Sequence, residues 1–317
     1  MKLFDNTTSN RVIIYTENLM RVTNIKSFKR IGNKNNQEAN TFKILYKRPS
    51  CTFDKVNKVL ELPDPFKFNQ KLTEDRDDYE VTAKLFYLPP SSTSIIESST
   101  PPSQFITQSV YHLFKLLGIN TIDTFIIYFN GFMFDGSNEI SNKFNKTSNM
   151  KNNRDDDLNN HGKSDIDNLL EAWKELETLH KKNMIYKLGV SEFTKNQLEN
   201  FIKAVEVPPK IDQINFDCCA IPKEIIEFAK KNNIELLSHN DSTDILPSTT
   251  FQKIIDDANT NKVRLNKDLS PRWVLKYSVM IPDRGVINNK GYIVMASTTN
   301  SDPKFTYTID EIEKNGF

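Results

Sequence analysis

The chain has 317 residues, of which 38% are hydrophobic and 26% are charged, and its formal net charge is +1. This balance gives no electrostatic footprint for nucleic acid or a membrane surface, so we expect neither as a partner. No apolar run reaches the roughly 20 residues of a membrane helix, and three cysteines are too few for a disulfide framework. The first residues lack the apolar core of a signal peptide, and we expect a cytoplasmic protein.

The first third of the chain has a weak pattern. Residues 12–15 predict a strand, but residues 22–80 are left unassigned apart from one unplaced strand before residue 60. From Val81 onward the pattern is clear, with a strand, an amphipathic helix and a second, buried strand that ends near residue 130. Gly118 follows that helix, where a left-handed C-terminal cap is favoured.

Residues 134–163 are rich in Asn, Lys, Ser and Asp and poor in aliphatic side chains. Such a segment cannot offset its ordering entropy by burial, so we interpret it as a disordered surface insertion in a single domain of residues 1–317. A tolerated loop expansion is the simpler explanation, and a partner-binding segment is the alternative. Residues 164–183 then predict an amphipathic helix that carries Trp173 on its apolar stripe.

The clearest pattern covers residues 184–244, where three short apolar runs alternate with two helical patterns. This alternation predicts a βαβαβ unit with parallel strands. Thr194 and Gln197 have the spacing of a capping box. Residues 249–260 and 270–280 predict two further helices before the last strand. Right-handed crossovers should close the sheet, and the chain length favours a (β/α)8 barrel over an open doubly wound sheet.

Four sequence segments resemble parts of the aldo-keto reductases. KLGVSEFTKNQLE (187–199) resembles their GVSNF-type strand and loop, and IDQIN (211–215) resembles their NQ-containing strand. IDTFIIYFN (122–130) is similar to their IDLYLIHWP strand, and VTAKLF (81–86) to the strand that ends in a catalytic lysine. The resemblance covers roughly residues 80–300. It implies a (β/α)8 barrel that binds NADPH at the C-terminal face.

The same resemblance implies a catalytic site from which this chain departs. Lys84 falls on the catalytic lysine, whereas Tyr128 stands where the family has a histidine. The DxxxxY motif, which supplies the tyrosine general acid and its aspartate, has no match in residues 45–75. We therefore expect no catalytic residues and no enzyme activity.

The implied nicotinamide site is only partly matched. Ser191 and Gln213 fall on the carboxamide-binding positions, but Glu192 replaces the asparagine between them and offers only acceptors when ionised. His239 replaces the aromatic that stacks on nicotinamide, and Ser297 replaces the basic residue that holds the 2′-phosphate. We expect no cofactor and, from the absence of metal-ligand spacing, no metal. Three residues are interpreted as vestiges of a cofactor site: Lys84, Ser191 and Gln213.

Two longer strings resemble one branch of this superfamily, the regulatory (modifier) subunits of glutamate–cysteine ligase. They are NFDCCAIPKEIIEFAKKNNIELLSHND (215–241) and WVLKYSVMIPDRGVINNKGYIVMA (273–296). The resemblance implies a non-catalytic partner that binds the catalytic subunit as a heterodimer, improves its use of glutamate and ATP, and relieves feedback inhibition by glutathione. Such regulation requires tighter binding to the active conformer of the catalytic subunit.

Cys218 and Cys219 follow a predicted strand and should lie at the C-terminal rim of the barrel. The resemblance implies that they contact the catalytic subunit. The alternative is two semi-buried apolar side chains without chemistry, because free cysteine is often buried and cytosolic disulfides are uncommon. For Asp241 we expect a capping or turn role.

Two other functions stay open. One is an NADPH-dependent reductase, which the matches at Lys84, Ser191 and Gln213 favour. The other is a binding module that senses NADPH or glutathione at the barrel mouth without turnover.

Overall fold

The computed structural model describes residues 8–21, 50–67, 70–88, 102–129, 165–215, 222–242, 244–298, 307–310 and 312. The strands are β1 (Arg11–Tyr15), β2 (Thr52–Asp54), β3 (Val59–Leu62), β4 (Glu80–Tyr87), β5 (Ile122–Tyr128), β6 (Ile185–Ser191), β7 (Ile211–Asn215), β8 (Glu235–His239), β9 (Ser270–Ile281) and β10 (Val286–Ser297). The α-helices are α3 (Pro102–Leu117), α5 (Asp165–Lys181), α6 (Lys195–Ala204), α7 (Lys223–Lys231) and α8 (Ser248–Thr260). Short 3-10 turns are η2 (Pro65–Lys67), η3 (Arg76–Asp78) and η4 (Pro282–Arg284). Within these ranges no helix has the length and apolar character needed to cross a bilayer.

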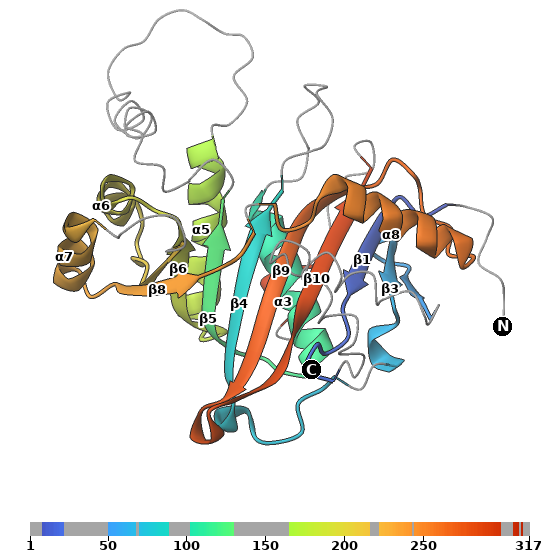
Figure 1. Cartoon of the computed structure of the whole chain (residues 1–317), viewed down its shortest axis with the longest axis horizontal. Helices are drawn as coiled ribbons and strands as arrows, with labels where there is room; N and C mark the ends of the chain where they lie inside the picture. The colour runs from blue at the N-terminus through green and yellow to red at the C-terminus, as the bar shows by residue number, and fades with distance from the viewer. Residues whose placement is uncertain are drawn as a thin grey trace, which may run out of the picture.

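All the strands belong to one mixed sheet with the order β2-β3-β1-β10-β9-β4-β5-β6-β7-β8. From β4 to β8 each strand is parallel to its neighbour, and α3, α5, α6 and α7 follow the strands in turn along the chain (Figure 1). The fold is therefore α/β, with the strand–helix alternation of a (β/α)8 barrel, and the predicted βαβαβ unit of residues 184–244 is confirmed.

The other half of the sheet departs from eight parallel repeats. Residues 270–280, predicted as a helix, belong to the long strand β9, which pairs antiparallel with both β4 and β10. Trp273, Leu275 and Tyr277 alternate along this strand and are all buried in the main core. Pairing on both sides and period-two burial determine the strand conformation, which outweighs the helix-start signal of Pro271.

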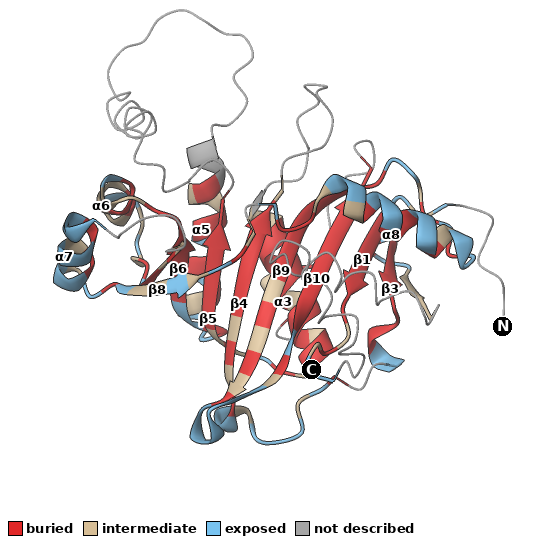
Figure 2. Ribbon diagram, in the orientation of Figure 1, coloured by how far each residue is buried: buried red, intermediate tan, exposed pale blue. Residues whose placement is uncertain are grey.

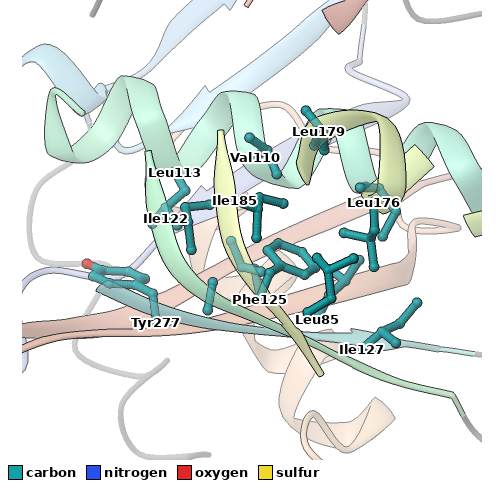
Figure 3. Packing of buried hydrophobic residues seen from close by; sticks show 14 of the residues in the cluster. Leu85, Val110, Leu113, Ile122, Phe125, Ile127, Leu176, Leu179, Ile185 and Tyr277 are labelled. Atoms are coloured by element: carbon teal, nitrogen blue, oxygen red, sulfur yellow. The ribbon is translucent and has the colours of Figure 1, made fainter. Parts of the chain in front are cut away.

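Two apolar cores lie on opposite faces of the sheet. The larger core packs α3 and α5 against β4, β5 and β6, and Figure 3 shows Phe125 and Leu176 within it. Both residues are fully buried, as is Trp173 of α5. The smaller core lies under α8, whose buried side includes Phe251 and Ile254. Figure 2 shows α8 exposed on its outer side and the strands beneath it buried. Both faces of the sheet are thus partly covered by helices.

Two local predictions are confirmed. Thr194 caps α6 through a capping box, in which its hydroxyl accepts from the Gln197 amide and the Gln197 side chain accepts from the Thr194 amide. Gly118 ends α3 with φ +68°, the left-handed conformation that glycine adopts without strain. The predicted insertion at residues 134–163 lies outside the described residues, and the single-domain organisation stays a prediction.

Candidate functional site

A group of polar side chains gathers on the sheet face opposite α3 and α5. Lys84 Nζ on β4 donates to Asp241 Oδ2 at 2.8 Å and to Ser191 Oγ at 2.9 Å. Lys276 on β9 forms a short ion pair with the other oxygen of Asp241. We call the following residues the mouth cluster: Lys84, Ser191, Glu192, His239, Asp241 and Lys276.

The Lys84–Asp241 ion pair reports the curvature of the sheet. Asp241 lies two residues after β8, and three strands separate β8 from β4 in the sheet order. In a flat sheet these two strands would be about 19 Å apart, at about 4.8 Å for each neighbour, which is beyond the reach of a lysine side chain. The parallel half of the sheet must therefore curl, as it does in a barrel, to bring the end of β8 over β4.

Burial and the neighbouring charges shift the pKa values of the Lys84–Asp241 ion pair in opposite directions. Burial alone would raise the pKa of Asp241, but Lys84 and Lys276 outweigh it and lower that pKa to about 2. Burial lowers the pKa of Lys84, and Asp241 opposes this shift. Asp241 is thus a carboxylate at any physiological pH. Its predicted capping role overlooked these ion pairs.

Ser191, His239 and Asp241 have the order of a nucleophile–base–acid triad. Ser191 Oγ lies 3.4 Å from His239 Nε2, and His239 Nδ1 lies 3.3 Å from Asp241 Oδ2. However, His239 Nε2 lies only 2.5 Å from Glu192 Oε1, so this nitrogen carries the proton that the carboxylate accepts. It cannot also accept the Ser191 proton, which is donated to the Gln213 carbonyl at 2.9 Å. Ser191 therefore lacks the general base that a nucleophile requires.

Glu192 directs its carboxylate inward. Its Oε1 accepts a hydrogen bond from the backbone amide of Asn215 at 3.0 Å and also faces His239. The residue has φ +66°, a left-handed conformation that asparagine adopts more readily than glutamate. A carboxyl group thus stands where the resemblance implies an amide.

Tyr128 and Phe86 lie beside Lys84 on the same face. Lys84 Nζ is 5.7 Å from the Tyr128 ring centroid and 5.1 Å from that of Phe86. Burial raises the pKa of Tyr128, and Glu192 and Asp241 raise it further. A general acid works best with a pKa near the operating pH, so this environment does not prepare the Tyr128 hydroxyl for proton donation.

Two acceptor atoms on β7 are buried without a partner in the described part of the chain, Gln213 Oε1 and Asp212 Oδ2. Asp212 is fully buried, and burial raises its pKa well above the ordinary value. The sequence predicted Gln213 as a site residue but not Asp212, because nothing in the IDQIN pattern distinguishes Asp212 from an ordinary polar strand residue. It also missed Lys276, because that residue was placed on a predicted helix.

A second buried polar cluster lies in the opposite core, between α3, β1 and β3. Lys115 Nζ donates to both oxygens of Glu61 at 2.7 Å, and the Tyr15 hydroxyl lies 2.6 Å from His112 Nδ1. Burial and the charge of Lys115 lower the pKa of His112 well below its usual range. Glu61 falls in the stretch that the sequence pattern left unassigned, so this cluster was not predicted.

Ser297, another predicted site residue, does not belong to the mouth cluster. Ser297 is fully buried at the end of β10, where it pairs with Arg11 of β1. Cys218 and Cys219 lie outside the described residues. Among the described residues, no group of three His, Cys, Asp or Glu side chains is arranged to hold a metal ion.

Two surface hollows lie away from the mouth cluster. One, of about 490 Å³, lies between α6 and α7, and the other, of about 420 Å³, lies between α3, α5 and Tyr307. Neither is lined by a mouth-cluster residue. The mouth-cluster side chains instead form hydrogen bonds and ion pairs with one another.

The fold and the mouth cluster define a barrel-type α/β protein in which a lysine on the first repeated strand faces the ends of β6 and β8. Residues 67–288 match the family model described as "Aldo/keto reductase family". The match covers well over half of the chain, and the chain belongs to the aldo/keto reductase family.

Within this family the chain is similar to proteins named glutamate–cysteine ligase regulatory subunit. The mouse protein (Mus musculus) is 35% identical over 137 residues, which are 43% of this chain and 49% of that protein. The human protein (Homo sapiens) is 28% identical over 229 residues, 72% of this chain and 70% of that protein. A putative regulatory subunit of Schizosaccharomyces pombe is 28% identical over 236 residues, 73% and 75% of the two chains. The chain thus spans about half the length of the mouse relative.

Proposed function

We propose that this chain is a non-catalytic regulatory subunit of a glutamate–cysteine ligase. It binds the catalytic subunit as a heterodimer in the cytoplasm, improves the use of glutamate and ATP, and relieves feedback inhibition by glutathione. The observation that carries the proposal is the similarity to regulatory subunits of this name across more than 70% of the chain.

The mouth cluster supports a role without turnover. Lys84, the one catalytic residue that the family resemblance matches, is neutralised by Asp241 and bonded to Ser191. Glu192 Oε1 is hydrogen-bonded to His239 and to the backbone amide of Asn215. Neither the arrangement of the Glu192 oxygens nor their charge therefore suits the binding of a nicotinamide carboxamide. These contacts use two of the three Lys84 donors and the His239 Nε2 donor, so fewer donors are available to a coenzyme or substrate.

Regulation by binding requires a difference in affinity. A partner raises the activity of the catalytic subunit only by binding its active conformer more tightly than its glutathione-inhibited conformer. A tenfold relief of glutathione inhibition corresponds to about 1.4 kcal/mol of such coupling. A contact surface of ordinary size is sufficient for a coupling of this magnitude.

Reconstitution with the catalytic subunit tests the proposal. We expect the two chains to copurify, and we expect the glutathione concentration for half-inhibition to rise when this chain is added. The purified chain alone should not oxidise NADPH in the presence of carbonyl substrates. Copurification without any change in glutathione, glutamate or ATP dependence would contradict the regulatory role.

The reductase alternative has its own readout. It rests on the 2.9 Å contact between Lys84 and Ser191, two positions that match the family's site. Trp173 and Trp273 are fully buried and report on the fold around α5 and β9. Saturable quenching of their fluorescence by NADPH, together with carbonyl-dependent turnover, would replace the regulatory proposal. Quenching without turnover would favour the sensing module.

The paired cysteines provide a finer test of the contact. We propose that Cys218 and Cys219 lie at the surface that binds the catalytic subunit. Replacing both with serine should weaken complex formation, and the loss should differ between oxidising and reducing buffers. Cys51→Ser is the matched control, because Cys51 is a half-buried free thiol beside β2. Unchanged assembly of the double variant under both conditions would remove the cysteines from the proposal.

A further inference from the structure

We propose that Lys84 and Lys276 form a receptor for a small carboxylate, and that in this structure the side chain of Asp241 occupies it. The proposal concerns a binding site in the mouth cluster and is independent of the regulatory function. It rests on the way in which the sheet, and not Asp241, positions the two lysines.

The two cations come from directly paired positions on neighbouring strands. Lys84 of β4 is the register partner of Lys276 of β9 in the antiparallel ladder, and both side chains lie on the same face. Like charges directly opposite each other destabilise a sheet. This pair of strands therefore presents two ammonium groups that require an anion between them.

The anion is supplied by a different part of the chain. Asp241 belongs to no strand or helix and lies two residues beyond the end of β8. One of its oxygens faces Lys84, with His239 Nδ1 3.3 Å away, and the other faces Lys276, so each oxygen has one lysine. This arrangement suits a planar anion with two oxygens, which is the geometry of a carboxylate.

Among the described residues of this site, Lys276 is the one most exposed to solvent. The side chains of Lys84 and Asp241 are 5% and 3% exposed, whereas that of Lys276 is 37% exposed. A small solute can therefore approach past Lys276 once the Asp241 carboxylate is absent. The side chains of Phe86 and Tyr128 beside Lys84 give the inner end an apolar wall.

Chemical rescue tests this assignment. Asp241→Ala removes only the carboxylate group, and formate has the size of the group removed. We expect formate to raise the melting temperature of Asp241→Ala by several degrees, in a saturable way, relative to sodium chloride at equal ionic strength. The wild-type protein should show no such rise, because its receptor is already occupied.

Three variants serve as controls. Asp241→Asn keeps the side-chain volume without the charge, so formate should find no room. Asp241→Ala combined with Lys276→Met should lose the formate effect, because one of the two cations is gone. Asp244→Ala changes an exposed aspartate of the same loop and should behave as wild type. If Asp241→Ala does not fold in chloride, its refolding yield in formate gives the same comparison.

The results separate the alternatives. Equal stabilisation by formate and chloride would overturn the proposal, because it would show only general screening of charge. Stabilisation that persists after Lys276→Met would overturn it as well. Rescue of the melting temperature or of the refolding yield by formate alone, and only with both lysines present, supports a carboxylate receptor.

Discussion

The buried ion pair between Glu61 and Lys115 joins the N-terminal strands to the core helix α3. Glu61 is fully buried on β3, and both of its oxygens accept from Lys115 Nζ at 2.7 Å. The Lys115 side chain is 10% exposed, so water provides little alternative solvation for either charge. Lys115→Met keeps the unbranched apolar body of the side chain and removes the terminal ammonium group.

We expect this substitution to lower the free energy of unfolding by about 3–5 kcal/mol at pH 8, the usual loss when one partner of a buried ion pair is removed. Burial already raises the pKa of Glu61, and Lys115 opposes that shift. Without Lys115 the pKa rises further. A carboxyl whose pKa is raised in the folded state loses stability as pH increases from its unfolded pKa through its folded pKa. The deficit of the variant should therefore be smaller at pH 5 than at pH 8.

Urea denaturation of the full chain at pH 5 and pH 8 measures both quantities. Lys203→Met is the matched control, because Lys203 pairs with Glu199 at 3.1 Å on the exposed surface of α6 and should change stability by less than about 1 kcal/mol. Adding Glu61→Gln to Lys115→Met should recover most of the loss. A deficit equal to that of the control, or one independent of pH, would refute the buried-charge explanation.

Three further substitutions follow from the packing. The free energy of unfolding should fall less between pH 5 and pH 8 in Asp212→Asn than in the wild type, because the raised pKa of buried Asp212 disfavours its ionised form. Unfolding curves at the two pH values measure this difference. Trp173→Ala should cost about 3–5 kcal/mol by urea denaturation, since it removes a fully buried ring 4.9 Å from that of Phe201. Gly291→Ala should lower the melting temperature, because its new Cβ would lie 2.7 Å from the Tyr277 hydroxyl oxygen; an unchanged melting temperature would mean that the strands shift freely.

Local signals in the sequence were sufficient for the parallel half of the fold. The capping box at Thr194 and the left-handed cap at Gly118 depend on neighbouring residues alone, and both are confirmed. The helix predicted at residues 270–280 is wrong, because the run is apolar on both faces and its period is ambiguous without knowledge of its neighbours. Its pairing with β4, almost 200 residues earlier in the chain, decides its conformation.

The candidate site was predictable only in part for the same reason. Lys84 and Ser191 were found through their resemblance to a family motif, and the structure places them 2.9 Å apart. Asp241 is 157 residues from Lys84 in the chain, and their contact depends on the curvature of the sheet. Lys276 was hidden by the error at β9. Contacts that depend on tertiary curvature leave no periodic signal in the sequence.

The changes within the mouth cluster reinforce one another. A left-handed glutamate at Glu192 carries a backbone penalty of about 1–3 kcal/mol, which its bonds to His239 and the Asn215 amide offset. Those bonds hold the His239 Nε2 proton away from Ser191, and Asp241 neutralises Lys84. Lys84, Glu192, His239 and Asp241 are thus paired with one another or with neighbouring backbone, which agrees with the proposed regulatory role.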